Sequence, residues 1–231
     1  MPNELIIKEL EPNRSEVLRY LRLPKEALPT PEFSAALDAA ERELLAAAEP
    51  RFVWRRFGIR QKPTGIKLSN SDVLLPGQDI TELLTEADSC LLLAATLGIT
   101  ADNLIRRAEP ADISHALLLD ALASAAVENL CDQVQAWLEQ KFAKENLFLT
   151  NRFSPGYGDL PLAMQRPLVL LLDAGRQIGL TVSQSHLLLP RKSVTAIIGV
   201  CHSPQPRRTD KCAVCPARYT CPYRQSGRCN Q

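Results

Sequence analysis

Two groups of residues in this 231-residue sequence have types and spacings suited to chemistry. The first is the turn from Arg152 to Asp159, in which Pro155 and Gly156 constrain the backbone. A proline fixes φ, and a glycine lets a ligand come close to the main chain. Arg152 offers a guanidinium fork that pairs with a carboxylate, and Tyr157 offers a ring and a hydroxyl. The composition of this turn is equally compatible with a structural turn whose arginine caps a carbonyl.

The second group is a cluster of cysteines near the end of the sequence. Five of the seven cysteines fall there: Cys201, Cys212, Cys215, Cys221 and Cys229. Such a cluster, in a chain whose start does not look like an export signal, favours metal binding over disulfides. Cys212 and Cys215 can place two thiolates on one metal, and the others can complete the site. Thiolate-rich sites hold zinc or iron–sulfur clusters, and the ligand type alone leaves both open.

A stripe of polar residues interrupts a long apolar helix, which we expect from about Asp112 to Lys144. The stripe repeats at intervals of four residues: Asp120, Ser124, Glu128 and Asp132. Residues spaced in this way share one helix face. The segment 116–127 is apolar on nearly every other side, so the helix should be buried between layers. From spacing alone, the stripe is expected to face water.

Helical and strand-like segments alternate along the rest of the sequence. Helices are expected at 15–21 with Asn13 as a cap, at 33–48, at 78–85, at 100–107 with Thr100 as a cap, and at 161–174. Strands are expected at 51–57, 90–97, 147–150, 184–189 and 193–200. The last two would form a hairpin across Pro190–Lys192. This mixture predicts an α+β fold with an antiparallel sheet.

Charge and hydropathy exclude several classes of protein. With 27 Lys+Arg and 26 Asp+Glu, the net charge of +1 gives no field to attract nucleic acid or anionic lipid. No apolar run approaches the roughly 20 residues of a membrane span, and the first residues lack the pattern of a signal peptide. We therefore expect a soluble, cytoplasmic protein without a nucleic-acid or membrane partner.

The turn and its surroundings also resemble a known family. The run Arg-Phe-Ser-Pro-Gly-Tyr from Arg152 resembles the Arg-x-x-Pro-Gly-Tyr motif of the activation domain of cobalamin-dependent methionine synthase. The segment 122–134 resembles the long helix of that family with its glutamate, and 180–196 resembles its late strand–turn–strand. The resemblance covers about 70–200 and implies a C-shaped α+β domain around a twisted antiparallel sheet.

The resemblance implies a ligand and a set of site residues. Domains of that family bind S-adenosylmethionine, which supplies the methyl group for reductive reactivation of cob(II)alamin. The matching residues are Glu128, Arg152, Ser154, Pro155, Gly156 and Tyr157. Arg152 would pair with the methionine carboxylate, and Glu128 would face the positive end of the ligand. The stripe would then line a site instead of facing water.

Two departures from the family are visible. Ile197 and Ile198 stand where the large enzyme has aromatic residues near its last strand. The sequence also offers no assigned counterpart to the N-terminal acidic ligand residue of the family. Its length leaves no room for homocysteine, folate or cobalamin modules, so the cobalamin would belong to a separate methionine synthase or corrinoid protein.

The family analogy favours iron in the cysteine cluster, because reactivation needs an electron as well as a methyl group. We therefore favour a 4Fe–4S cluster on Cys201, Cys212, Cys215 and Cys221, with Cys229 spare or replacing Cys201, and zinc as the alternative. An electron donor would be a further partner. The expected organisation is an N-terminal region at 1–69, an activation-like domain at 70–200 and a cysteine-rich tail at 201–231.

The leading functional hypothesis is a stand-alone component that binds S-adenosylmethionine and supports methylation of cobalamin on its partner. One alternative is a non-catalytic module that senses the ligand or bridges subunits through a zinc-stabilised tail. The other is an iron–sulfur reductase of corrinoid proteins that has lost the ligand site.

Overall fold

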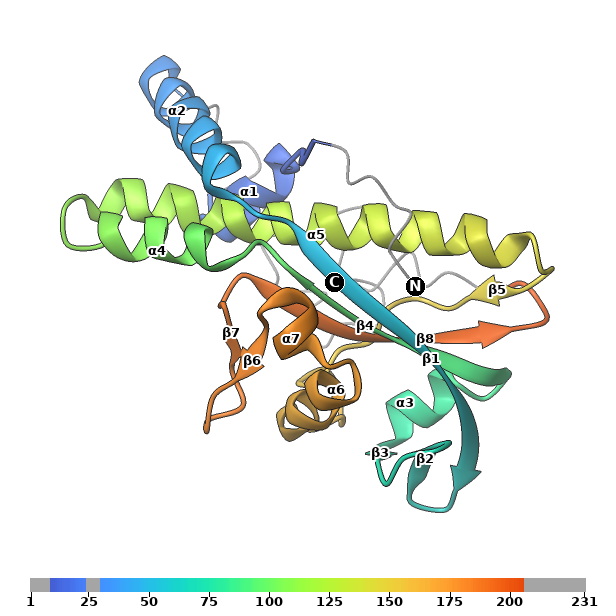
Figure 1. Ribbon diagram of the computed structural model, residues 1–231. Coiled ribbons are helices and arrows are strands. Elements are labelled where there is room, and N and C mark those ends of the chain that lie inside the picture. The colour runs from blue at the N-terminus through green and yellow to red at the C-terminus, as the bar shows by residue number, and fades with distance from the viewer. Residues whose placement is uncertain (1–8, 24–29, 206–231) are drawn as a thin grey trace.

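The computed structural model describes residues 9–23 and 30–205, and it confirms the predicted α+β fold (Figure 1). Six antiparallel strands form one sheet in the order β3-β2-β1-β4-β8-β5. Their bounds are β1 Arg51–Lys62, β2 Gly65–Leu68, β3 Leu74–Pro76, β4 Ala87–Thr96, β5 Phe148–Leu149 and β8 Ser193–Cys201. A separate two-stranded sheet joins β6 (Thr181–Val182) to β7 (Leu188–Leu189).

Helices cover both faces of the main sheet. They are α1 Arg14–Tyr20, α2 Pro31–Ala47, α3 Gln78–Leu83, α4 Ile99–Ala108, α5 Ile113–Ala143, α6 Gln165–Leu171 and α7 Ala174–Ile178. In Figure 1, α5 crosses one face together with α1, α2 and α4, while α3, α6 and α7 lie on the other. No helix in the described ranges is both long and apolar enough to cross a membrane.

Strand β4 lies at the centre of the sheet and supplies two hydrophobic cores. Leu91 and Leu93 pack into the core beneath α5, whereas Cys90 and Leu92 pack into the core beneath α6 and α7. Successive side chains of a strand point to opposite faces, so a strand covered on both faces is apolar at every position. The apolar run at 90–97, which only Thr96 interrupts, therefore follows from the position of β4 between two layers.

Local signals placed several elements correctly. Asn13 Oδ1 accepts the backbone N–H groups of Ser15 (2.9 Å) and Glu16 (3.4 Å), which confirms the predicted cap of α1. Asp112 likewise caps α5, whose 31 residues match the predicted long helix. The predicted Thr100 cap is wrong, because α4 begins at Ile99 after Gly98, whose φ of 85° ends β4.

The predicted hairpin across Pro190–Lys192 is also wrong. Strand β7 pairs with β6, and β8 instead pairs with β4 and β5 in the main sheet. Asp102 on α4 fixes the turn between β7 and β8, since its carboxylate accepts the backbone N–H groups of Arg191 (2.5 Å) and Lys192 (3.2 Å). The connection thus leaves one sheet and enters another.

The helix expected at 161–174 consists of separate pieces. A 3-10 turn at Leu162–Met164 leads into α6, and α7 starts only after Asp173, which has a left-handed φ of 51°. The division at residue 69 stays a prediction; β1 and β2, which precede it, pair within the same sheet as β4.

Candidate functional site

The polar stripe on α5 binds two cations that come from different parts of the chain. At its N-terminal half, Lys192 Nζ lies 2.8 Å from Asp120 Oδ1 and donates to Ser124 Oγ at 2.9 Å. Only 11% of the Lys192 side chain is exposed. This half of the stripe therefore holds the segment that enters β8, and its role is structural.

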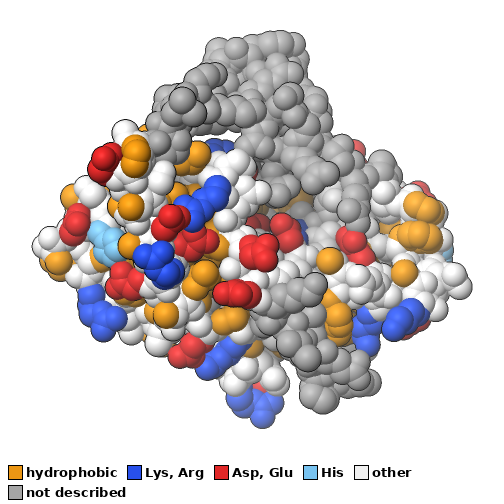
Figure 2. All heavy atoms as spheres, turned by 90° about the horizontal axis from the view of Figure 1, so that it is seen from above, with side chains coloured by type: hydrophobic (Ala, Val, Ile, Leu, Met, Phe, Trp, Pro, Cys, Tyr) orange, Lys and Arg blue, Asp and Glu red, His pale blue; other side chains and the backbone are white. Residues whose placement is uncertain are grey.

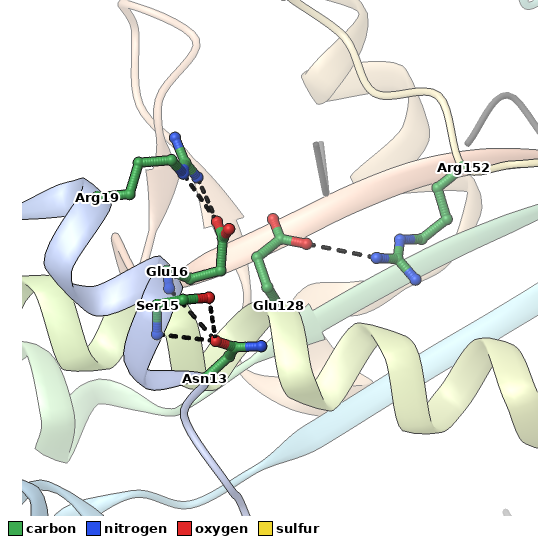
Figure 3. Close-up of polar contacts among 6 residues, drawn as sticks. All are labelled: Asn13, Ser15, Glu16, Arg19, Glu128 and Arg152. Atoms are coloured by element: carbon green, nitrogen blue, oxygen red, sulfur yellow. Dashed lines mark hydrogen bonds and ion pairs between the residues drawn. The ribbon is translucent and has the colours of Figure 1, made fainter. Parts of the chain in front are cut away.

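The C-terminal half of the stripe binds Arg152, which follows β5 (Figure 3). Arg152 Nη2 lies 2.7 Å from Asp132 Oδ1 and 3.4 Å from Glu128 Oε2, and Nη1 donates to Gln135 Oε1 at 2.9 Å. Burial lowers the pKa of Arg152, but Cys131, followed by the carboxylates of Asp132 and Glu128, outweighs it, and the pKa is raised overall. The guanidinium stays charged, and α5 orients it from three successive turns of helix.

A pocket lies between this part of α5 and the beginning of the described chain. Its volume is about 350 Å³, within the range of small-molecule sites. The N-terminal wall consists of Glu11, Pro12, Asn13, Glu16 and Tyr20, and the α5 wall consists of Ala125, Glu128, Asn129 and Asp132. Figure 2 shows the molecule from the side of α1 and α5, where several acidic side chains gather near the centre of the view.

Two contacts attach the N-terminal wall to α5. The Glu11 backbone N–H donates to Asn129 Oδ1 at 3.1 Å, and Gln133 Nε2 donates to the Glu9 carbonyl at 3.4 Å. Analysis of the sequence predicted α1 but missed its contribution to the site. The acidic residues on either side of Asn13 were the one sequence signal for an acidic pocket wall. Helix periodicity does not say which helix packs against Glu128.

Glu128 contacts Arg152, shares the pocket wall with Tyr20, and acts electrostatically on Tyr20 and Tyr157. Burial, followed by the Glu128 carboxylate, raises the phenol pKa of both Tyr20 and Tyr157. Arg19 Nη2 lies 2.6 Å from Glu16, and its guanidinium stacks 4.5 Å from the centre of the Tyr20 ring. The site thus contains two aromatic rings. The pocket wall has four acidic side chains, and two arginines, Arg19 and Arg152, lie beside them.

The Pro-Gly-Tyr turn has a defined internal structure. Phe153 exchanges backbone hydrogen bonds with Ile197 on β8 at 2.8 and 2.9 Å, which fixes the start of the turn in the sheet. Pro155 is buried, and the Tyr157 N–H donates to the Ser154 carbonyl at 3.2 Å. Gly156 has a φ of 95°, a conformation that favours glycine. The turn leaves Tyr157 46% exposed.

The cysteine prediction falls mostly outside the described residues, since Cys212, Cys215, Cys221 and Cys229 all lie beyond residue 205. Cys201 is described: it ends β8 and is fully buried, and burial followed by Asp88 and Glu86 raises the pKa of its thiol. Within residues 9–23 and 30–205, no group of three or more His, Cys, Asp or Glu side chains is arranged to hold a metal. The metal site stays a prediction.

Comparison with solved structures identifies a protein with a similar fold. The crystal structure of the MetH reactivation domain bound to AdoHcy matches 72% of this chain with a TM-score of 0.56. The fold is that of the MetH reactivation domain. Sequence identity is 17%, so the likeness concerns the fold, and this chain spans 65% of the length of that reactivation domain. No family model and no curated protein matches the sequence.

Within the reactivation-domain fold, the predicted site residues divide into two groups. Glu128 lines the α1–α5 pocket, and Arg152 contacts it there. Ser154, Pro155, Gly156 and Tyr157 do not line that pocket, and the first three shape the turn that carries Tyr157. The first group contacts the pocket directly, and the second lies outside its walls.

Proposed function

We propose that this protein binds S-adenosylmethionine in the α1–α5 pocket and presents its methyl group to cobalamin on a separate protein. One observation carries the proposal. Arg152, from the turn that resembles the family motif, meets Glu128 and Asp132 at the edge of a ligand-sized pocket. The MetH reactivation domain, which has this fold, was crystallised with AdoHcy.

The charges of the pocket suit a zwitterionic sulfonium. Such a ligand carries a carboxylate, an ammonium and a positive sulfur, so it needs one cationic and several anionic contacts. Arg152 has five N–H donors, and its contacts with Glu128, Asp132 and Gln135 use three of them, both on Nη2 and one on Nη1. The ligand carboxylate would bind to the Nε–H or to the second Nη1–H. Glu128 and the acidic residues of the N-terminal wall would attract the positive groups.

Methyl transfer from a sulfonium to reduced cobalt needs positioning more than acid–base chemistry. A separate cobalamin protein, after a donor has reduced cob(II)alamin by one electron, would supply a cobalt nucleophile that takes the methyl group while S-adenosylhomocysteine leaves. No proton moves in this displacement, so no general base is expected. The task of Arg152, Glu128 and the two tyrosines is to hold the ligand in one orientation.

The cysteine-rich tail is proposed to hold a metal centre that relays this electron. The buried thiol of Cys201, whose pKa is raised, is a poor source of thiolate. Its environment favours the alternative in which Cys229 completes the set with Cys212, Cys215 and Cys221. An iron–sulfur cluster would serve the electron-transfer role, whereas zinc would make the tail purely structural.

The test is calorimetric titration of S-adenosylmethionine into the anaerobically purified protein, beside Arg152→Ala. We expect micromolar binding that the substitution weakens at least about tenfold, equivalent to about 1.4 kcal/mol. Arg176→Ala is the matched control, because Arg176 is 80% exposed and forms an ion pair with Asp173, which directly precedes α7. Absence of binding to the unmodified protein would refute the proposal, and equal affinity of both arginine variants would refute the role of Arg152.

A further inference from the structure

The turn that carries Tyr157 is attached to α3 by a reciprocal contact between two aspartates. Asp159 Oδ2 accepts the backbone N–H of Gln78 at 2.5 Å, and Asp159 Oδ1 accepts that of Asp79 at 3.2 Å. In return, Asp79 Oδ2 accepts the backbone N–H of Asp159 at 3.3 Å. We call this arrangement the Asp79–Asp159 pair.

The backbone on both sides of the Asp79–Asp159 pair favours glycine. Gly77 has a φ of 118°, and a Cβ there would lie 2.5 Å from Asp159 Oδ1. Gly158 has a φ of 51°, and a Cβ there would lie 1.9 Å from Asp79 Oδ2. Two aspartates and two glycines are therefore matched across about 80 residues of sequence.

The pair also supplies a cap that α3 lacks. Gly77, at the N-cap position, has no side chain to accept the first N–H groups of the helix. Asp159 accepts two of them from outside the helix, which satisfies donors that would otherwise need water. Ile80 and Leu84 are fully buried, so α3 is a fixed support for the turn.

Tyr157 consequently stands on a turn that is held at both ends. Phe153 fixes its beginning to β8, and Asp159 fixes its end to α3. Between them, Pro155 is buried and Tyr157 makes backbone hydrogen bonds to Ser154 and Leu160 at 3.2 and 3.1 Å. The Tyr157 side chain is left about half exposed.

We propose that Asp159, together with Asp79, is a positioning residue that holds the turn carrying Tyr157 in place and thereby sets ligand affinity. The inference rests on the proposed function, because it gives Tyr157 a place in the ligand site. Neither Asp159 nor Tyr157 lines the α1–α5 pocket, so Tyr157 would contact the part of the ligand that extends beyond it, and the effect of Asp159 must pass through the turn.

The test is a double-mutant cycle with Asp159→Asn and Tyr157→Phe, measured by titration with S-adenosylmethionine. An asparagine at position 159 keeps one oxygen that can accept a hydrogen bond. Its NH₂ group would face the other of the two backbone N–H groups, so that hydrogen bond is lost. We expect Asp159→Asn to weaken binding of S-adenosylmethionine about tenfold. In a protein that already carries Tyr157→Phe, the same change should leave the affinity almost unchanged. Asp79→Asn should behave like Asp159→Asn, and Asp173→Asn, an exposed carboxylate elsewhere, should leave affinity unchanged.

NMR of tyrosines labelled at Cζ provides a readout that a general loss of stability would not change. The sequence has four tyrosines, and Tyr157→Phe assigns the signal of interest. In folded Asp159→Asn, we expect the Tyr157 signal to shift and its titration to move toward that of a free tyrosine, while the Tyr20 signal stays in place. An unmoved Tyr157 signal, or an additive cycle, would overturn the inference.

The two proposals fail in different ways. If the unmodified protein does not bind S-adenosylmethionine, the proposed function fails, and the NMR comparison alone decides whether Asp159 positions Tyr157. If the ligand binds equally to the unmodified protein and to folded Asp159→Asn and Asp79→Asn, the function stands and the positioning role is wrong.

Discussion

Replacing Lys192 by methionine should separate the structural half of the α5 stripe from the half that belongs to the ligand site. Methionine retains most of the apolar stem but removes the ammonium that contacts Asp120 and Ser124. We expect Lys192→Met to destabilise the protein while leaving affinity for S-adenosylmethionine unchanged. Arg152→Ala should lower that affinity, since Arg152 contacts the pocket residues Glu128 and Asp132.

The size of the effect follows from the geometry. A 2.8 Å separation between Nζ and Asp120 Oδ1 gives a gross attraction of about 6 kcal/mol at an effective dielectric constant of 20. Most of this is cancelled by desolvation of Lys192, and the 42% exposure of Asp120 lets water screen the pair and replace the lost contact. We therefore expect a net loss of about 1–2 kcal/mol, or about 2–8 °C in Tm.

The assay is urea denaturation of Lys192→Met, Asp120→Asn and the double variant, followed by titration with S-adenosylmethionine. The cycle should give a coupling free energy of about 1 kcal/mol that persists in high salt, because only 11% of the Lys192 side chain is exposed. A coupling below about 0.3 kcal/mol would refute the assignment of this contact as structural support. A tenfold loss of ligand affinity in Lys192→Met would refute the division of the stripe.

Three other predictions test separate parts of the structure. Cys90 and Cys131 have thiol pKa values raised to about 12 by burial, so neither should react with iodoacetamide near neutral pH until urea unfolds the protein; labelling followed by mass spectrometry checks this, and modification of the native protein would contradict it. Gly158→Ala should cost at least about 2 kcal/mol in urea denaturation, because it combines a positive φ with a clash against Asp79, and an unchanged midpoint would speak against that contact. Burial, followed by the Glu128 carboxylate, raises the phenol pKa of Tyr20, so the stability that Tyr20 contributes is complete below the unfolded pKa near 10 and is lost as pH rises above it. Between about pH 9 and pH 11, Tyr20→Phe should therefore lose less stability than the unmodified protein in urea denaturation. Identical losses would disprove the shift.

Local signals explain which parts of the fold could be predicted. The apolar run of β4 and the long helix α5 are determined by neighbouring residues, and both were placed within a few positions. The path between β7 and β8 depends on Asp102, which is 89 residues away from Arg191. No periodicity or turn composition carries that information, so the sequence pattern predicted a hairpin where the chain changes sheets.

The site shows the same division between local and distant causes. Spacing placed Glu128 and Asp132 on one helix face, but it predicted that face to be exposed. Only the family resemblance put Glu128 and Arg152 in one ligand site, where each would contact a different end of the ligand. Their ion pair with each other, and that of Arg152 with Asp132, was not predicted. The pocket wall from Glu11 to Tyr20 could not have been predicted, because its packing against α5 joins segments 118 residues apart.

That wall has a consequence for kinetics. Helix α1 has seven residues, too few to be stable in isolation, so its order depends on docking against α5. A ligand in the α1–α5 pocket would touch both helices and would slow amide hydrogen exchange throughout 14–20. Its departure would then be coupled to local opening of α1, and the lifetime of the bound state would be governed by how often that short helix detaches.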